Sequence, residues 1–125
     1  MLKATYLTPL EGVVLDDKSF MVTKPFIVSF SPGIKLKNDF RRVQLRVPSE
    51  FITDFASVPR IPVAWLLAGD RARRAAVVHD YLCSLKTCTY KEAARAFEAC
   101  MREEKVSWWR RWAMTKAVLW FGPRF

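Results

Sequence analysis

The chain has 125 residues, and 51% of them are hydrophobic, which is enough for one packed core and excludes a disordered tail. Lys and Arg total 21 against 12 Asp and Glu, giving a formal net charge of +9. This balance favours contact with phosphate, anionic lipid or an acidic protein surface. The N-terminus lacks a secretory signal pattern, and no run approaches the roughly 18 apolar residues of a membrane span. We therefore expect the chain to be cytoplasmic at synthesis.

The N-terminal half, residues 1–62, contains six of the seven prolines, and its apolar runs are short and bounded by turn-forming residues. Short runs rich in β-branched and aromatic residues are typical of strands. We predict three strands, Phe20–Val22, Phe26–Phe30 and Val43–Val47, with loops at Ser31-Pro32-Gly33 and Lys37-Asn38-Asp39. This half should form a small antiparallel sheet.

The C-terminal half, residues 63–125, loses proline until position 123 and is rich in alanine, leucine and arginine. Thr89-Tyr90-Lys91-Glu92 has the form of a capping box, which marks the start of a helix. We predict helices over residues 63–68, over 71–84 with Asp70 as N-cap, after Thr89, and over Trp108–Phe121 with Ser107 as N-cap. The sequence thus predicts one α+β domain over residues 1–125, with the sheet packed against three or four helices.

Three cysteines, Cys83, Cys88 and Cys100, fall in the predicted helical half. Their number is odd, and no CxxC or Cys/His pair has the spacing of a zinc site. We expect them to be buried free thiols in a reducing compartment.

Two polar segments interrupt the apolar pattern. The first is Thr53-Asp54-Phe55-Ala56-Ser57-Val58-Pro59-Arg60, and the second, His79-Asp80-Tyr81-Leu82, holds the only histidine of the chain. Together with Val47-Pro48 and Ala75-Ala76, these segments resemble the small phage and prophage proteins collected as domain-of-unknown-function family 1353. The resemblance implies a phage or prophage source and leaves the function open.

The same residues could form a site. His79 and Asp80 are neighbours on a predicted helix and point about 100° apart. An imidazole is a natural general base near neutral pH, and Asp54 could orient it. The order His-Asp-Tyr on one helix is similar to secreted phospholipases A2, and that resemblance implies His79 as base and Asp80 as a calcium ligand. The alternatives are a hydrogen-bonded buried histidine and an Asp54 that holds its own loop in place.

The chain departs from the phospholipase pattern in three ways. No Gly-rich calcium loop is present, the paired disulfides are absent, and the helix after Thr89 has Ala94 where an aspartate is wanted. We therefore expect no cofactor, with calcium as the alternative. The sequence favours a non-enzymatic role, and an enzymatic one would be hydrolytic, either phospholipase-like or directed at peptidoglycan.

The C-terminal helix mixes four tryptophans with three basic residues. Such a helix suits a protein contact, a membrane interface or a nucleic-acid backbone. The alternative is that the tryptophans complete the core. The interface residues that we predict are Trp108, Trp109, Arg110, Arg111 and Trp112.

These features lead to three functional hypotheses. The first is a phage or prophage protein of the tail or tail tip, made in the host cytoplasm and incorporated into the virion. It would bind other phage structural proteins or further copies of itself; a membrane surface is the next partner we consider, and nucleic acid ranks last. The second is a hydrolase that uses His79, Asp80 and Asp54. The third is a host-directed accessory protein.

Overall fold

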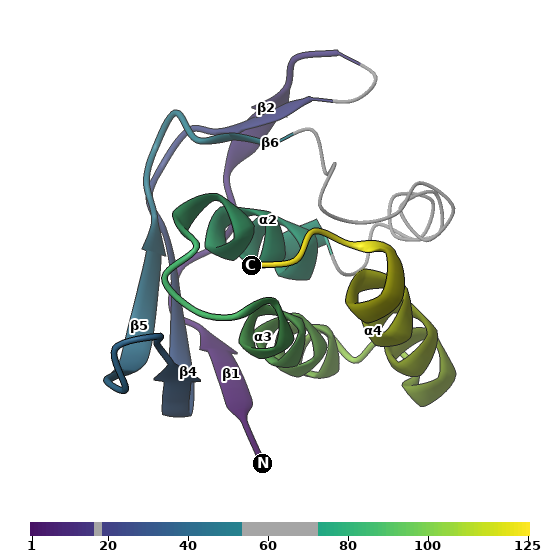
Figure 1. Ribbon diagram of the computed structural model, residues 1–125. Coiled ribbons are helices and arrows are strands. Elements are labelled where there is room, and N and C mark those ends of the chain that lie inside the picture. The colour runs from purple at the N-terminus through teal and green to yellow at the C-terminus, as the bar shows by residue number, and fades with distance from the viewer. Residues whose placement is uncertain (17–18, 54–72) are drawn as a thin grey trace.

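The computed structural model describes residues 1–16, 19–53 and 73–125 (Figure 1). The described chain begins with six strands and ends with three helices. The strands are β1 (Lys3–Tyr6), β2 (Gly12–Val14), β3 (Phe20–Val22), β4 (Phe26–Lys35), β5 (Arg41–Val47) and β6 (Ile52–Thr53), and the helices are α2 (Arg73–Leu85), α3 (Tyr90–Glu103) and α4 (Trp108–Phe121). The predicted α+β class is confirmed.

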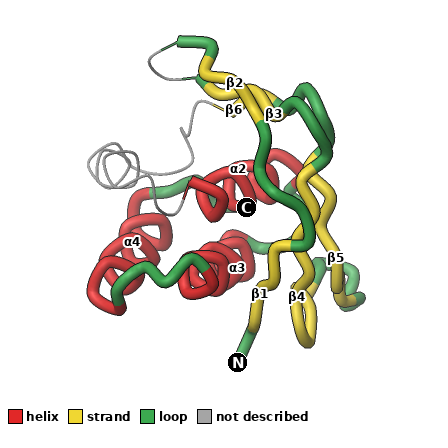
Figure 2. Tube along the Cα trace, turned by 180° about the vertical axis from the view of Figure 1, so that it is seen from behind, coloured by secondary structure: helices red, strands yellow, loops and turns green. Residues whose placement is uncertain are grey.

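The strands form two small antiparallel sheets instead of the single sheet predicted. One has the order β1-β4-β5 and the other β2-β3-β6. All three helices lie on the same side of the β1-β4-β5 sheet, as the two opposite views show (Figures 1 and 2). No helix of residues 1–16, 19–53 and 73–125 covers the other face of that sheet.

The core lies between the β1-β4-β5 sheet and the helices. Along each strand alternate side chains point to opposite faces, so one set from each strand is buried. Helix α3 packs against β1, β4, α2 and α4. The largest fully buried side chains are Phe26, Phe30, Phe97, Ile34, Leu45, Leu82 and Met101.

Several strand predictions need correction. Ser31-Pro32-Gly33 was predicted to be a loop, but β4 runs through it to Lys35. The ladder with β5 is irregular between Ser29 and Ile34, and Gly33 has φ +124°, a conformation that side chains with a Cβ rarely adopt. The turn signal was therefore real, but it marks a bulge within a strand. The short strands β1 and β2 were not predicted, and the helix over 63–68 and the cap at Asp70 fall outside the described residues.

Helices α3 and α4 begin at the predicted N-cap residues. Thr89 Oγ1 accepts a hydrogen bond from the Glu92 backbone N–H at 3.3 Å. The Ser107 side chain makes no such bond, although it occupies the same position before α4. The two caps therefore differ in what their hydroxyl groups contribute.

Replacing Thr89 with alanine should lower the free energy of unfolding by about 1 kcal/mol, because the Glu92 N–H loses its acceptor. Ser107→Ala is the matched control, and we expect it to cost less than half as much. Urea unfolding followed by circular dichroism measures both. Equal losses would contradict the capping assignment.

Candidate functional site

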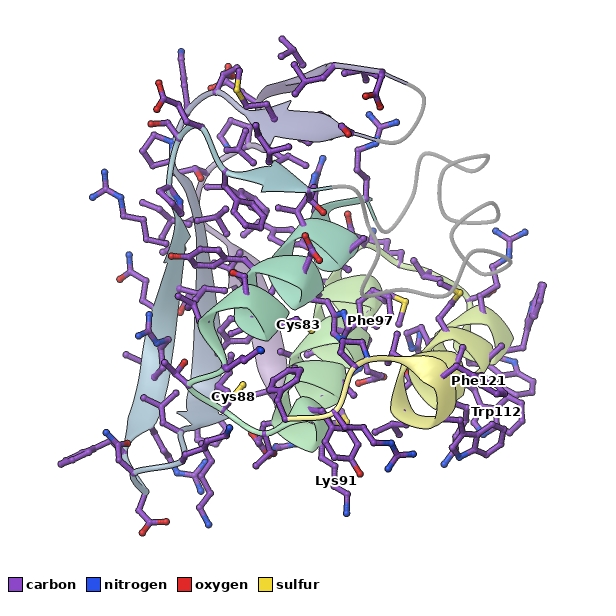
Figure 3. All side chains as sticks on the ribbon, turned by 45° about the horizontal axis from the view of Figure 1, so that its top comes forward. Cys83, Cys88, Lys91, Phe97, Trp112 and Phe121 are labelled. Atoms are coloured by element: carbon purple, nitrogen blue, oxygen red, sulfur yellow. The ribbon has the colours of Figure 1, made fainter. Side chains whose placement is uncertain are left out.

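His79 lies inside the molecule. Its side chain is buried at 3% exposure, on the face of α2 that packs against α3. The Phe97 ring lies 5.0 Å from the imidazole, and Cys83 Sγ lies 3.8 Å from Nε2. Figure 3 shows Cys83 on α2 and Phe97 on α3 in the same buried region. Burial lowers the pKa of His79 from 6.5 to about 4, so the ring is neutral at pH 7.

The other two predicted site residues are placed differently. Asp80 follows His79 on α2 and is only partly buried. Asp54 lies outside the described residues, as do Ser57 and Arg60 of the same segment. Thr53, the last residue of β6, is buried, and β6 packs against α2.

A metal ion would need a cluster of ligating side chains, and a disulfide would need two adjacent cysteines. Over residues 1–16, 19–53 and 73–125 no group of three or more His, Cys, Asp and Glu side chains could hold a metal ion. Cys83, Cys88 and Cys100 are buried and form no disulfide, as predicted. Burial raises the pKa of the Cys100 thiol well above its usual range, so it is protonated and unreactive.

A second buried polar cluster was not predicted. Glu104, at the end of α3, accepts a hydrogen bond from the Ala75 N–H at 3.3 Å and lies 4.0 Å from Arg74 Nε. The Tyr6 hydroxyl donates to the Cys100 carbonyl at 3.2 Å, and Arg74 stacks over the Tyr6 ring. These residues come from β1, α2 and α3. No local sequence signal marks them, because their positions differ by up to 98.

The cluster has unusual protonation behaviour. Burial raises the pKa of Glu104 from 4.5 to about 7, although the Ala75 N–H and Arg74 act in the opposite direction. Burial also raises the pKa of Tyr6 far above its usual range, so that the phenol stays neutral. The cluster therefore joins three elements through a carboxyl group that is about half protonated near pH 7.

The outer side of α4 carries large apolar side chains. Trp108, Trp109, Trp112 and Trp120 are 72%, 46%, 59% and 60% exposed, whereas Met114 and Val118 hold the helix to the core. With 100° per residue, the four tryptophans fall within an arc of about 120°. We call these four residues the tryptophan face. The alternative that they complete the core is wrong.

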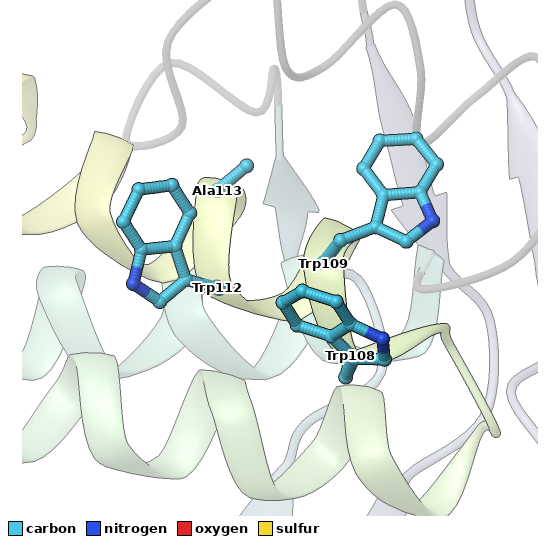
Figure 4. Close-up of a pocket in the computed structure, with 4 residues that line it drawn as sticks. All are labelled: Trp108, Trp109, Trp112 and Ala113. Carbon is cyan, nitrogen blue, oxygen red and sulfur yellow. The ribbon is translucent and has the colours of Figure 1, made fainter.

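Three of these indoles surround an open pocket of about 390 Å³, lined by Trp108, Trp109, Trp112 and Ala113 (Figure 4). The small side chain of Ala113 leaves room beside the indole of Trp112. The pocket is lined almost wholly by carbon, so it suits an apolar group.

The two arginines of the predicted interface have different environments. The Arg110 guanidinium lies 5.1 Å from the Trp109 ring and is exposed. Arg111 turns to α3, where its Nε lies 3.3 Å from Glu98 and its Nη1 donates to the Val106 carbonyl at 2.8 Å. The Arg110 side chain can therefore contact a partner, whereas Arg111 links α4 to α3 through its ion pair with Glu98.

Comparison with known proteins gives a family and little more. A family model described as "Protein of unknown function (DUF1353)" matches residues 33–118. An uncharacterized protein, y4jT of Sinorhizobium fredii, is 32% identical over 101 residues, which is 74% of this chain and 30% of that protein. The chain thus spans about a third of that relative's length. No solved structure matches significantly. Among the described residues, no helix is long and apolar enough to cross a bilayer.

The buried groups predict two opposite pH dependences of stability. Unfolded His79 binds a proton below pH 6.5, but the folded ring does not until about pH 4, so its contribution is lost as the pH falls through this interval. Folded Glu104 keeps its proton up to about pH 7, but the unfolded side chain loses it above pH 4.5, so its contribution is lost as the pH rises. These two contributions should largely cancel between pH 4.5 and 6.5.

Single variants should expose each dependence. The free energy of unfolding of His79→Leu, relative to wild type, should fall by about 3 kcal/mol as the pH rises from 4 to 6.5. That of Glu104→Gln, relative to wild type, should rise by about 3 kcal/mol as the pH rises from 4.5 to 7. Chemical unfolding at a series of pH values gives both curves. A stability difference that does not vary with pH in either variant would show that the residue titrates alike in both states.

Proposed function

Since the chain belongs to the DUF1353 family of proteins of unknown function, we propose from its physical features that it is a docking protein that joins a larger assembly through the tryptophan face of α4. The observation that carries the proposal is the exposure of four tryptophans on one side of one helix. Tryptophan and arginine dominate the energetics of protein interfaces.

The exposed area supports this proposal. A tryptophan buries roughly 150–250 Å² when it is covered, so four half-exposed indoles leave roughly 400 Å² of apolar surface in water. A patch of this size is comparable to the largest apolar patch of a typical monomer, which is often a functional surface. Covering it would favour binding, and the rigid α4 backbone holds the indoles in place without a large entropy cost.

The charge around the tryptophan face indicates the partner's chemistry. Residues 105–125 contain five Lys and Arg and no Asp or Glu. Arg110 lies beside Trp109, and Lys116 falls within the same arc of the helix. We propose a protein partner with an apolar groove bordered by carboxylates, because that surface complements both the indoles and the positive charge.

The finer version of the proposal places this docking in a phage tail or tail tip, and it is supported by the resemblance to phage and prophage proteins. A host-directed accessory protein would use the same face on a host partner. A hydrolase that uses His79, Asp80 and Asp54 is the alternative. The near-complete burial of the His79 ring weighs against it, because a general base must reach a water molecule or a substrate.

A photo-cross-linking side chain at position 113, which lines the same pocket, should trap one acidic protein in the native host. The partner is then identified by mass spectrometry, purified and titrated by calorimetry. Trp112→Ala should weaken binding at least about tenfold, since a central interface tryptophan contributes 2 kcal/mol or more. If the assembly is a phage particle, purified particles should contain the chain at a fixed copy number.

Phe40→Ala is the matched control, because Phe40 is an exposed aromatic residue in the turn between β4 and β5, away from α4 (Figure 1). Binding should be unchanged in this variant. Three results would overturn the proposal: cross-links only between copies of the chain, sedimentation with anionic vesicles that Trp112→Ala abolishes, or equal losses in the two variants.

A further inference from the structure

The β1-β4-β5 sheet has an outer face that the helices do not cover (Figures 1 and 2). Its buried face includes Ala4, Val28 and Leu45, so their neighbours along each strand point outward. The outward side chains are Lys3, Thr5, Ile27, Ser29, Ser31, Gln44 and Arg46. Six of these seven are hydroxyl, amide or basic groups.

The strand register sets these groups in order. Thr5, Ser29 and Gln44 are directly opposite one another on the three strands. Lys3, opposite Ser31, lies two residues along the strands on one side of this row, and Arg46, opposite Ile27, lies two residues away on the other side. From strand spacing and rise, the two charges lie roughly 17 Å apart across the face. Hydroxyl and amide groups therefore fill the strip between two cations.

The sheet has no carboxylate of its own. Its three strands carry five Lys and Arg and no Asp or Glu. Lys35 is 3.9 Å from Asp39, but in the part of the chain that the structure describes, Lys3 and Arg46 form no ion pair. The positive potential of this face is therefore not neutralised locally.

From this arrangement we infer that the outer face of the β1-β4-β5 sheet binds the sugar–phosphate backbone of a nucleic acid. Lys, Arg, Ser, Thr and Gln side chains are the donors that contact phosphate oxygens. A protein partner would need an apolar centre, and a membrane would need apolar anchors. The outward set has one apolar side chain, Ile27, and Val43 is the one large exposed apolar residue that these three strands add to it. The site is separate from the tryptophan face, so its test is independent of the test of the proposed docking.

The test is fluorescence anisotropy with a labelled 20-nucleotide strand and with its duplex, at 50 and 200 mM salt. We expect binding that weakens with salt, since it releases counterions from the backbone. The double variant Lys3→Ala/Arg46→Ala should bind at least about tenfold more weakly and reduce the salt slope by about two. The form that binds more tightly, single strand or duplex, is the form of nucleic acid that this face recognises.

Lys86→Ala/Lys91→Ala is the control, because it removes the same charge from the helical side of the molecule, and its affinity should stay within about twofold of wild type. Thr5→Val removes a donor without changing charge and should also weaken binding. The inference is overturned if wild type does not bind at 50 mM salt, if the control loses as much affinity as the sheet variant, or if polyglutamate of equal charge displaces the strand as well as unlabelled oligonucleotide does.

Discussion

The fold depends on the close approach of α3 to its neighbours. This helix contacts β1, β4, α2 and α4, and it turns only one stripe, which carries Lys91, Arg95, Glu98 and Arg102, toward water. Such packing requires small side chains, and Ala93, Ala94, Ala96 and Ala99 are all fully buried. Phe97 and Met101 fill the wider spaces between them. Because interiors are densely packed, an added methylene at any of these alanines would displace a neighbouring element.

The same arrangement determines which surfaces are left for partners. Helix α4 buries only a narrow stripe, Met114 and Val118, and it is further held by Arg111 on Glu98. Its remaining circumference is apolar and basic. The sheet, which α3 covers on one side, exposes a polar and basic face on the other. The two surfaces differ in chemistry as strongly as in position, and this is why we assign them to different partners.

Sequence reasoning succeeded where a signal was local. The capping pattern at Thr89 predicted the start of α3, and the short run Val43–Val47 predicted most of β5. It failed where a contact joins distant positions. Tyr6 and Glu104 meet only because β1 packs on α3, and β1 is too short to show a pattern. The site prediction was limited likewise, since residue type did not reveal how completely the His79 ring is enclosed.

The contact of β1 with α3 also has a consequence during translation. The strands leave the ribosome first, and their apolar face, which includes Phe26 and Phe30, is covered only when α3 follows more than forty residues later. At roughly 5–20 residues per second, this delay lasts on the order of seconds. A nascent chain thus exposes the apolar face of these strands throughout that interval. A chaperone that covers this face would raise the yield of native protein.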